Sequence, residues 1–179
     1  MVPSTPLSKG FSPIADSRAR VLVLGSLPGQ KSLEMGQYYA QPRNAFWRIM
    51  GRLCGAEPTL PYGARLECLR AHRIAVWDVL AAGERRGSLD SAIVGASIVV
   101  NDFAAFFADH EEIGLICFNG AKAAELYRRR VQPRLEAPLA ALESCLLPST
   151  SPAHASLSFE QKLDRWRAAL GAFAPKPVS

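Results

Sequence analysis

Short apolar runs alternate with longer amphipathic stretches along most of this chain. Buried strands of a parallel sheet have continuous apolar runs, whereas helices repeat apolar positions at intervals of three and four. The runs predict strands at residues 21–24, 74–77, 115–118 and 142–147. Stretches with helical spacing lie between and after them, at 46–53, 62–71, 103–107, 122–130 and beyond Ser158. This order predicts an α/β fold, a three-layer α/β/α sandwich around a four-stranded, mainly parallel sheet.

Polar residues mark the starts of two predicted helices. Asn101 or Asp102 can cap the helix over residues 103–107, and Ser158 can cap the closing helix. The closing helix carries three apolar residues on one face: Leu163, Trp166 and Leu170. Residues 82–87 and 133–138 read as loops, and residues 1–19, which mix Pro, Ser, Gly and charge, as an N-terminal arm.

The residues that follow the predicted strands indicate where a ligand would bind. In an open parallel sheet the ligand site lies beyond the carboxyl ends of the strands, where the connecting loops gather. The loops in question are Gly25–Gly29, Asp78–Leu80, Asn119–Gly120 and Pro148–Pro152. We therefore expect these four loops to converge on one pocket.

Length and composition narrow the class of protein. A chain of 179 residues, 49% of them hydrophobic, can form one domain with its own core, and we predict a single domain over residues 1–179. Its apolar runs are far shorter than the roughly 20 residues that cross a bilayer, so no membrane association is expected. The first residues lack the basic and apolar segments of a secretory signal, which favours the cytoplasm. The net charge of +5 favours a polyanionic partner without requiring one.

Several kinds of chemistry lack their usual residues. The four cysteines are dispersed, with no C-x-x-C pair and no histidine at ligand spacing, so we expect buried thiols and no metal site. The first loop has no lysine and hydroxyl at the spacing of a G-x-x-x-x-G-K-[ST] phosphate loop, so hydrolysis of nucleoside triphosphates is not expected. No paired carboxylates or Ser-His-Asp order stand out. His154, Asp78 and Asp102 remain as titratable candidates near strand ends or helix starts.

The remaining polar candidates each have two interpretations. Backbone amides from Ser26 onward could face a ligand oxygen, or the loop could be only a tight turn. Asn44 could cap a helix or work in a site. Tyr39 could belong to the core, or its ring could stack on a planar heterocycle. Asn119 ends a buried strand, where its amide needs partners, and it can equally fasten a turn.

Four stretches, taken together and in this order, resemble the motifs of the uracil-DNA glycosylase superfamily. They are Gly25-Ser26-Leu27-Pro28-Gly29, Tyr38–Trp47, Phe118-Asn119-Gly120 and Leu147–Ala153. Within this superfamily the chain is most similar to the hypoxanthine-DNA (deoxyinosine) glycosylase branch. The likeness extends from Gly10 to Trp166 and includes residues 77–80, 86–90 and 101–103. It implies a four-stranded central parallel sheet, a role in base-excision repair and no cofactor.

Two departures from the wider superfamily affect the implied chemistry. The mismatch-specific uracil branch has a water-positioning asparagine where this chain has Leu27, and leucine cannot do that work. The hypoxanthine branch also lacks that asparagine, and the resemblance assigns the water-positioning role to Asn44 instead. The classical uracil branch opens its last motif with a histidine, whereas this chain has Leu147 there. His154 is therefore not its equivalent and is expected in a DNA-facing loop.

The resemblance thus implies a monofunctional enzyme that flips a deaminated base, most simply hypoxanthine, out of DNA and hydrolyses its glycosidic bond. Asn44 would be catalytic. The base would be held by Gly25, Ser26, Leu27, Tyr39 and Asn119. DNA would be held by Ser149, Thr150, Ser151 and His154, with Pro152 and Ala153 beside His154 as a wedge in the vacated stack. The partner is DNA that contains deaminated bases, and a monomer is the simplest expectation.

Three alternatives stay open from the sequence. The substrate could be uracil, although Leu27 argues against it. The protein could bind damaged DNA without catalysis, with strong salt dependence and no released base. It could also be a small-nucleotide binding module, which would bind free nucleotides without DNA.

Overall fold

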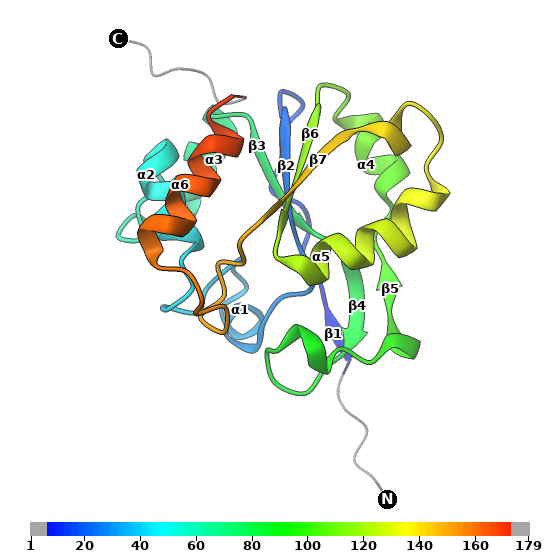
Figure 1. Ribbon diagram of the computed structural model, residues 1–179, viewed down its shortest axis with the longest axis horizontal. Coiled ribbons are helices and arrows are strands. Elements are labelled where there is room, and N and C mark those ends of the chain that lie inside the picture. The colour runs from blue at the N-terminus through cyan, green and yellow to red at the C-terminus, as the bar shows by residue number, and fades with distance from the viewer. Residues whose placement is uncertain (1–6, 173–179) are drawn as a thin grey trace, which may run out of the picture.

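A four-stranded parallel sheet forms the centre of the protein in this computed structural model, which describes residues 7–172 (Figure 1). Its strands are β2 (Val21–Gly25), β3 (Ile74–Asp78), β6 (Leu115–Asn119) and β7 (Glu143–Leu147), in the order β3-β2-β6-β7. Every neighbouring pair is parallel. All residues of β2, β3 and β6 are buried, as their unbroken apolar runs predict. The predicted sheet and its four strands are confirmed.

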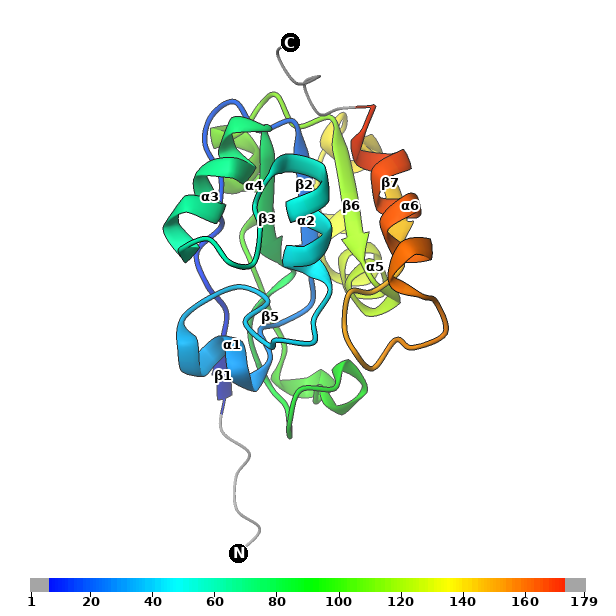
Figure 2. The ribbon, with the colours of Figure 1, turned by 90° about the vertical axis from the view of Figure 1, so that its left-hand side faces the viewer.

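Helices cover both faces of the sheet and complete three layers (Figures 1 and 2). One face packs against α2 (Phe46–Cys54), α3 (Tyr62–Ala71) and α6 (Phe159–Leu170). The other packs against α4 (Phe103–Asp109) and α5 (Ala121–Leu126), which continues as a π-helical turn (Tyr127–Val131). Short 3₁₀ turns occur at Asp90–Ala92, Gly95–Ser97, Gln132–Arg134 and Leu139–Ala141. The three-layer arrangement agrees with the α/β/α prediction.

The predicted caps hold where the structure tests them. The Asp102 carboxylate accepts a hydrogen bond of 3.0 Å from the backbone N–H of Ala105 and so starts α4. Ser158 starts α6 through a reciprocal pair of bonds with Gln161. The three apolar residues expected on one face of α6 are all buried: Leu163, Trp166 and Leu170.

Residues 82–87 were expected to form a loop, and that prediction is wrong for its first half. β4 (Leu80–Glu84) pairs antiparallel with β1 (Leu7–Lys9) and with β5 (Val99–Val100), which makes a second, three-stranded sheet. The predicted N-terminal arm therefore contributes a strand, while its residues 1–6 lie outside the described part. β4 is rich in Ala and Gly, which have low strand propensity, so its pairing depends on partners distant in sequence.

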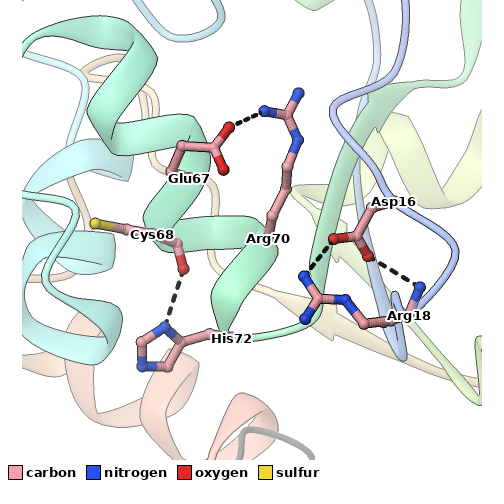
Figure 3. Close-up of polar contacts among 6 residues, drawn as sticks. All are labelled: Asp16, Arg18, Glu67, Cys68, Arg70 and His72. Atoms are coloured by element: carbon pink, nitrogen blue, oxygen red, sulfur yellow. Dashed lines mark hydrogen bonds and ion pairs between the residues drawn. The ribbon is translucent and has the colours of Figure 1, made fainter.

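A set of exposed polar contacts shapes the chain where it enters the amino ends of β2 and β3 (Figure 3). The Asp16 carboxylate accepts hydrogen bonds from the backbone N–H of Arg18 at 2.9 Å and from its guanidinium at 2.8 Å. At the end of α3, Arg70 pairs with Glu67 at 2.5 Å, and His72 Nδ1 lies 2.9 Å from the Cys68 carbonyl oxygen. Exposed ion pairs contribute at most about 1 kcal/mol, so these contacts mainly fix local geometry.

The cysteines are free thiols. Cys54 and Cys117 are buried, as expected, whereas Cys68 and Cys145 are half-buried. Cys117 and Cys145 face each other on neighbouring strands, with their sulfur atoms 3.4 Å apart.

Within residues 7–172, no group of three or more His, Cys, Asp or Glu side chains is placed to hold a metal ion. In the same part of the chain, no helix is long and apolar enough to span a membrane.

Candidate active site

A cavity of about 640 Å³ opens at the carboxyl end of the parallel sheet. All four loops that follow the strands contribute to its lining, as predicted: Gly25–Gly29, Asp78, Asn119 and Ser149–Pro152. Further lining comes from residues between β2 and α2, among them Tyr39 and Asn44, and from residues 88–90. This volume lies within the usual range of small-molecule pockets.

A buried arginine holds the backbone of the first loop, Gly25–Gly29. Arg85, whose side chain is only 1% exposed, donates hydrogen bonds to the carbonyl oxygens of Leu27 (3.3 Å) and Pro28. Its guanidinium also lies 3.4 Å from the Asp90 carboxylate, which accepts a 2.5 Å bond from the Ser26 hydroxyl. The Ser26 hydroxyl is thus engaged with Asp90, and the loop is fixed before any ligand binds. Burial lowers the pKa of Arg85, and the carboxylates of Asp90 and Asp78 oppose that shift.

Asn44 lines the cavity and lies one residue before Ala45, which is the N-cap of α2 and has no side-chain cap bond, so Asn44 is not itself the capping residue. Its Oδ1 accepts a 3.0 Å hydrogen bond from the backbone N–H of Phe46, which fixes the plane of the amide. Asn44 itself is half-buried. Because a carbonyl oxygen has two lone pairs, Oδ1 keeps one acceptor site for a water molecule.

Tyr39 is held rigidly between α1 (Gln30–Met35) and α2. Its backbone has a φ of +53°, in the left-handed region that residues other than glycine rarely adopt. One face of its ring stacks on Phe46, with ring centroids 4.1 Å apart. Tyr38, by contrast, is a core residue whose hydroxyl donates to the Ser12 carbonyl oxygen at 2.9 Å. Burial and then the nearby Asp78 charge raise the pKa of the Tyr39 hydroxyl, so it stays protonated.

Asn119 and Thr150 bind each other. The Asn119 amide donates to Thr150 Oγ1 and accepts from the Thr150 backbone N–H, both at 2.9 Å. The Thr150 carbonyl oxygen then accepts a 2.9 Å bond from the backbone N–H of Ala45. These bonds join β6, the last loop and the start of α2. Asn119 keeps one amide hydrogen for a ligand, whereas Thr150 is 1% exposed and faces inward.

The last loop is anchored by α6. Lys162 is buried and donates to the carbonyl oxygen of His154 at 2.7 Å, and the Trp166 indole donates to that of Pro148 at 3.0 Å. Burial lowers the pKa of Lys162. The Ser149 and Ser151 hydroxyl oxygens accept backbone N–H bonds within the loop, each at 3.2 Å. Their hydroxyl hydrogens therefore remain able to donate.

Asp78 is a titratable residue of the lining that is buried and only partly hydrogen-bonded. It ends β3, is 4% exposed, and its Oδ2 has no hydrogen-bond partner among residues 7–172. Leaving a buried polar atom unpaired costs about 1–3 kcal/mol, and more for a charged group. The pKa of this carboxyl is raised to about 7, mainly by burial and then by the Asp90 charge, while Arg85 opposes the rise.

Sequence reasoning brought the right loops together but missed several residues that build the site. Arg85, Asp90 and Lys162 were not singled out, because a charged residue in a sequence is ordinarily expected at the surface. Leu89, which is 58% exposed at the cavity, was also missed. Residues 86–90 did carry part of the family resemblance, and this was the available signal.

Comparison with known proteins decides the family. Residues 12–171 match the family model described as "Uracil DNA glycosylase superfamily". The chain belongs to the uracil DNA glycosylase superfamily.

Relatives within this superfamily carry a narrower name. A protein named "Hypoxanthine DNA glycosylase" from Methanosarcina acetivorans is 37% identical over 163 residues, which cover 90% of this chain and 97% of that protein. A second protein of that name, from Methanosarcina barkeri, is 39% identical over 118 residues, 65% of this chain and 73% of that protein. A solution NMR structure from M. acetivorans, described as a candidate uracil DNA glycosylase, has a TM-score of 0.77 and 35% identity. The match covers 94% of this chain and 99% of that one.

Proposed function

We propose that this protein is a monofunctional DNA glycosylase that removes hypoxanthine from DNA in base-excision repair. The observation that carries the proposal is the joint placement of Asn44, Tyr39 and Asn119 on one cavity, in a chain similar to two hypoxanthine DNA glycosylases. Flipping a base costs a few kcal/mol, and least when the base is mispaired. Hypoxanthine left by adenine deamination stands opposite thymine, so its weak pairing would favour its extrusion.

The extruded base would be held by rigid groups. Its ring would stack on the face of Tyr39 that Phe46 does not cover, since base stacking contributes about 1–3 kcal/mol. The free amide hydrogen of Asn119 and the backbone of Gly25, Ser26 and Leu27 would contact its polar edge. As the glycosidic bond breaks, negative charge develops on the base, and fixed donors stabilise that charge.

Asn44 would direct water to the sugar. An amide is no base near neutral pH, so its contribution would be the placement of a water molecule beside the anomeric carbon. The bond from the Phe46 N–H fixes the amide, which limits the entropy lost when the water is positioned. Among the lining residues, Leu27 offers only its backbone and an apolar side chain for this task.

DNA would be held around the cavity mouth. The Ser149 and Ser151 hydroxyls would donate to phosphates that flank the flipped nucleotide. Thr150 would act indirectly, by fixing the loop through Asn119. Apolar side chains can fill the gap that a displaced base leaves in the stack. Leu89 provides the largest exposed one at the rim, in addition to the loop that ends at His154.

The activity is tested with duplexes that contain inosine, uracil, xanthine or undamaged bases, followed by alkaline cleavage of abasic sites. We expect release of hypoxanthine in preference to uracil. Preferred release of uracil would assign the protein to the uracil-specific alternative. Binding of inosine-containing DNA without release of any base would show a non-catalytic binder, and affinity for free nucleotides alone would show a nucleotide-binding module.

The role of Asn44 is tested against Asp102, the side-chain cap of α4. Asn44→Ala and Asp102→Ala each remove a side chain that accepts a backbone N–H at a helix start, at a cost of about 0.5–2 kcal/mol. Only Asn44→Ala should reduce base release, by about 100-fold or more. Equal activity of the two folded variants would remove Asn44 from the mechanism.

The proposed enzyme would work as one glycosylase domain and as a monomer in the cytoplasm. Size-exclusion chromatography with light scattering, with and without inosine-containing duplex, tests its oligomeric state. The basic character of the chain, with a net charge of +5, supports DNA binding of the salt-dependent kind.

A further inference from the structure

One group in the cavity has no part in the mechanism above. Asp78 stands at the end of β3, in register with Gly25 on β2. Its backbone carbonyl oxygen accepts a 2.8 Å bond from the Asn101 amide, which fixes the end of the strand. Its carboxyl lines the cavity, and Oδ2 has no hydrogen-bond partner within residues 7–172. Buried polar atoms in folded proteins nearly always have partners, so this one calls for an explanation.

Gly25 leaves the space in which the carboxyl stands. A Cβ atom added at Gly25 would lie 2.4 Å from Asp78 Oδ1 and 3.0 Å from the Tyr39 hydroxyl oxygen. Any larger residue would therefore displace both groups. The Tyr39 hydroxyl is likewise buried and makes no hydrogen bond of good geometry among the described residues, although the nearby Asn119 side chain lowers its pKa. A carboxyl and a phenol thus converge on one point of the cavity, where a ligand with a polar edge would complete their bonding.

The surroundings of Asp78 favour its protonated form up to about neutral pH. Its pKa is raised to about 7, chiefly by burial and then by the Asp90 carboxylate, against the opposing effect of Arg85. Tyr38 and Tyr39 are the other titratable groups close to it, and both stay neutral because burial raises their pKa values. Below neutral pH, Asp78 therefore exists largely as a carboxylic acid that can donate its proton, and near pH 7 about half of the molecules still carry that proton.

We propose that Asp78 is a general acid that transfers its proton to a ring nitrogen of the departing purine. This inference rests on the proposed function. The C1′–N9 bond breaks and its electron pair passes to the base, while the Asp78 O–H proton moves to the ring nitrogen. The oxygen of the attacking water bonds to C1′ and releases a proton to solvent. Asp78 then recovers a proton from solvent, so each turnover consumes one water and releases neutral hypoxanthine.

The acid complements the other groups of the cavity. Amide donors can only offset part of the charge that develops on the base, whereas a transferred proton cancels it. General acid catalysis contributes about 100- to 10,000-fold when the pKa of the acid lies near the working pH. The pKa of Asp78 meets this condition, and its carboxyl lines the cavity in which the base would lie. It differs from Asn44 in acting on the base and not on the water.

The test measures single-turnover release of hypoxanthine from an inosine duplex between about pH 5.5 and 9, across the range in which the acid would titrate. We compare the wild-type protein with Asp78→Asn, and with Asp109→Asn, which makes the same chemical change at an exposed site. The wild-type rate should fall as pH rises through about 7, and Asp109→Asn should follow it. Asp78→Asn should be about 100-fold slower at pH 6 and independent of pH.

The outcomes separate the two proposals. If the wild-type protein releases no base at any pH, the proposed function fails. If it releases hypoxanthine at a rate that stays level or rises toward pH 9, the role of Asp78 is overturned while the function stands. The same conclusion follows if Asp78→Asn keeps the wild-type pH profile. The wild-type profile decides the question even if the variant does not fold.

Discussion

Replacing Asp78 by asparagine should change how the stability of the protein depends on pH. The pKa of the folded carboxyl is about 7, against an ordinary value of 3.8 for aspartate. Between these two values the folded protein holds a proton that the unfolded chain has lost, so the free energy of unfolding falls as pH rises. Each pKa unit corresponds to 1.36 kcal/mol, so the full effect is about 4 kcal/mol, of which about 3 kcal/mol falls between pH 5 and 8. Asparagine does not titrate and escapes this loss.

The measurement is urea unfolding of the wild-type protein, Asp78→Asn and Asp109→Asn at pH 5 and pH 8. Other titrating groups cancel in the difference between variant and wild type. We expect the stability of Asp78→Asn relative to wild type to increase by about 3 kcal/mol from pH 5 to pH 8. The exposed Asp109→Asn should show no such increase. A difference that is the same at both pH values, within about 0.5 kcal/mol, would refute the raised pKa.

Three further predictions concern groups around the cavity. Leu89→Ala should slow release from duplex inosine by about 10-fold and leave single-stranded DNA unaffected, since only a duplex needs a wedge; Leu146→Ala, 53% exposed on β7, is the control. Lys162→Met should lower the free energy of unfolding by about 1–3 kcal/mol in urea, and an unchanged value would mean that its bond to His154 contributes nothing. Arg85→Lys keeps the charge but loses the planar fork, so hypoxanthine release should fall about 10-fold with circular dichroism unchanged, and full activity would contradict this.

The central sheet was predictable because parallel strands buried on both faces must be apolar throughout. The apolar runs Val21–Leu24 and Leu115–Phe118 fit a strand that is covered on both faces. The second sheet was not predictable for the opposite reason. β4 consists of Leu80–Glu84, with two alanines and a glycine, and β1 and β5 have only three and two residues. Their pairing is decided by contacts between segments far apart in sequence, which a local pattern does not record.

The candidate site was predictable as a set of loops and only partly as a set of contacts. The rule for parallel sheets places Asn119 and the loop at Gly25 on one edge. The likeness to family motifs added Asn44 and Tyr39. Nothing local indicates that Arg85 and Lys162 are buried, because their burial depends on backbone carbonyl groups that other elements supply. Asp78 was visible as a titratable residue, but its raised pKa follows from burial that only the assembled fold reveals.

The dependence of the last loop on α6 bears on how the protein is made. Lys162 and Trp166 hold the loop from Pro148 to His154, and they come late in the described chain. During translation the sheet and most of the cavity can assemble before these residues leave the ribosome, but the mouth cannot. A nascent chain that still lacks α6 would therefore lack its grip on DNA, and base removal would have to wait until α6 has been synthesised and has docked.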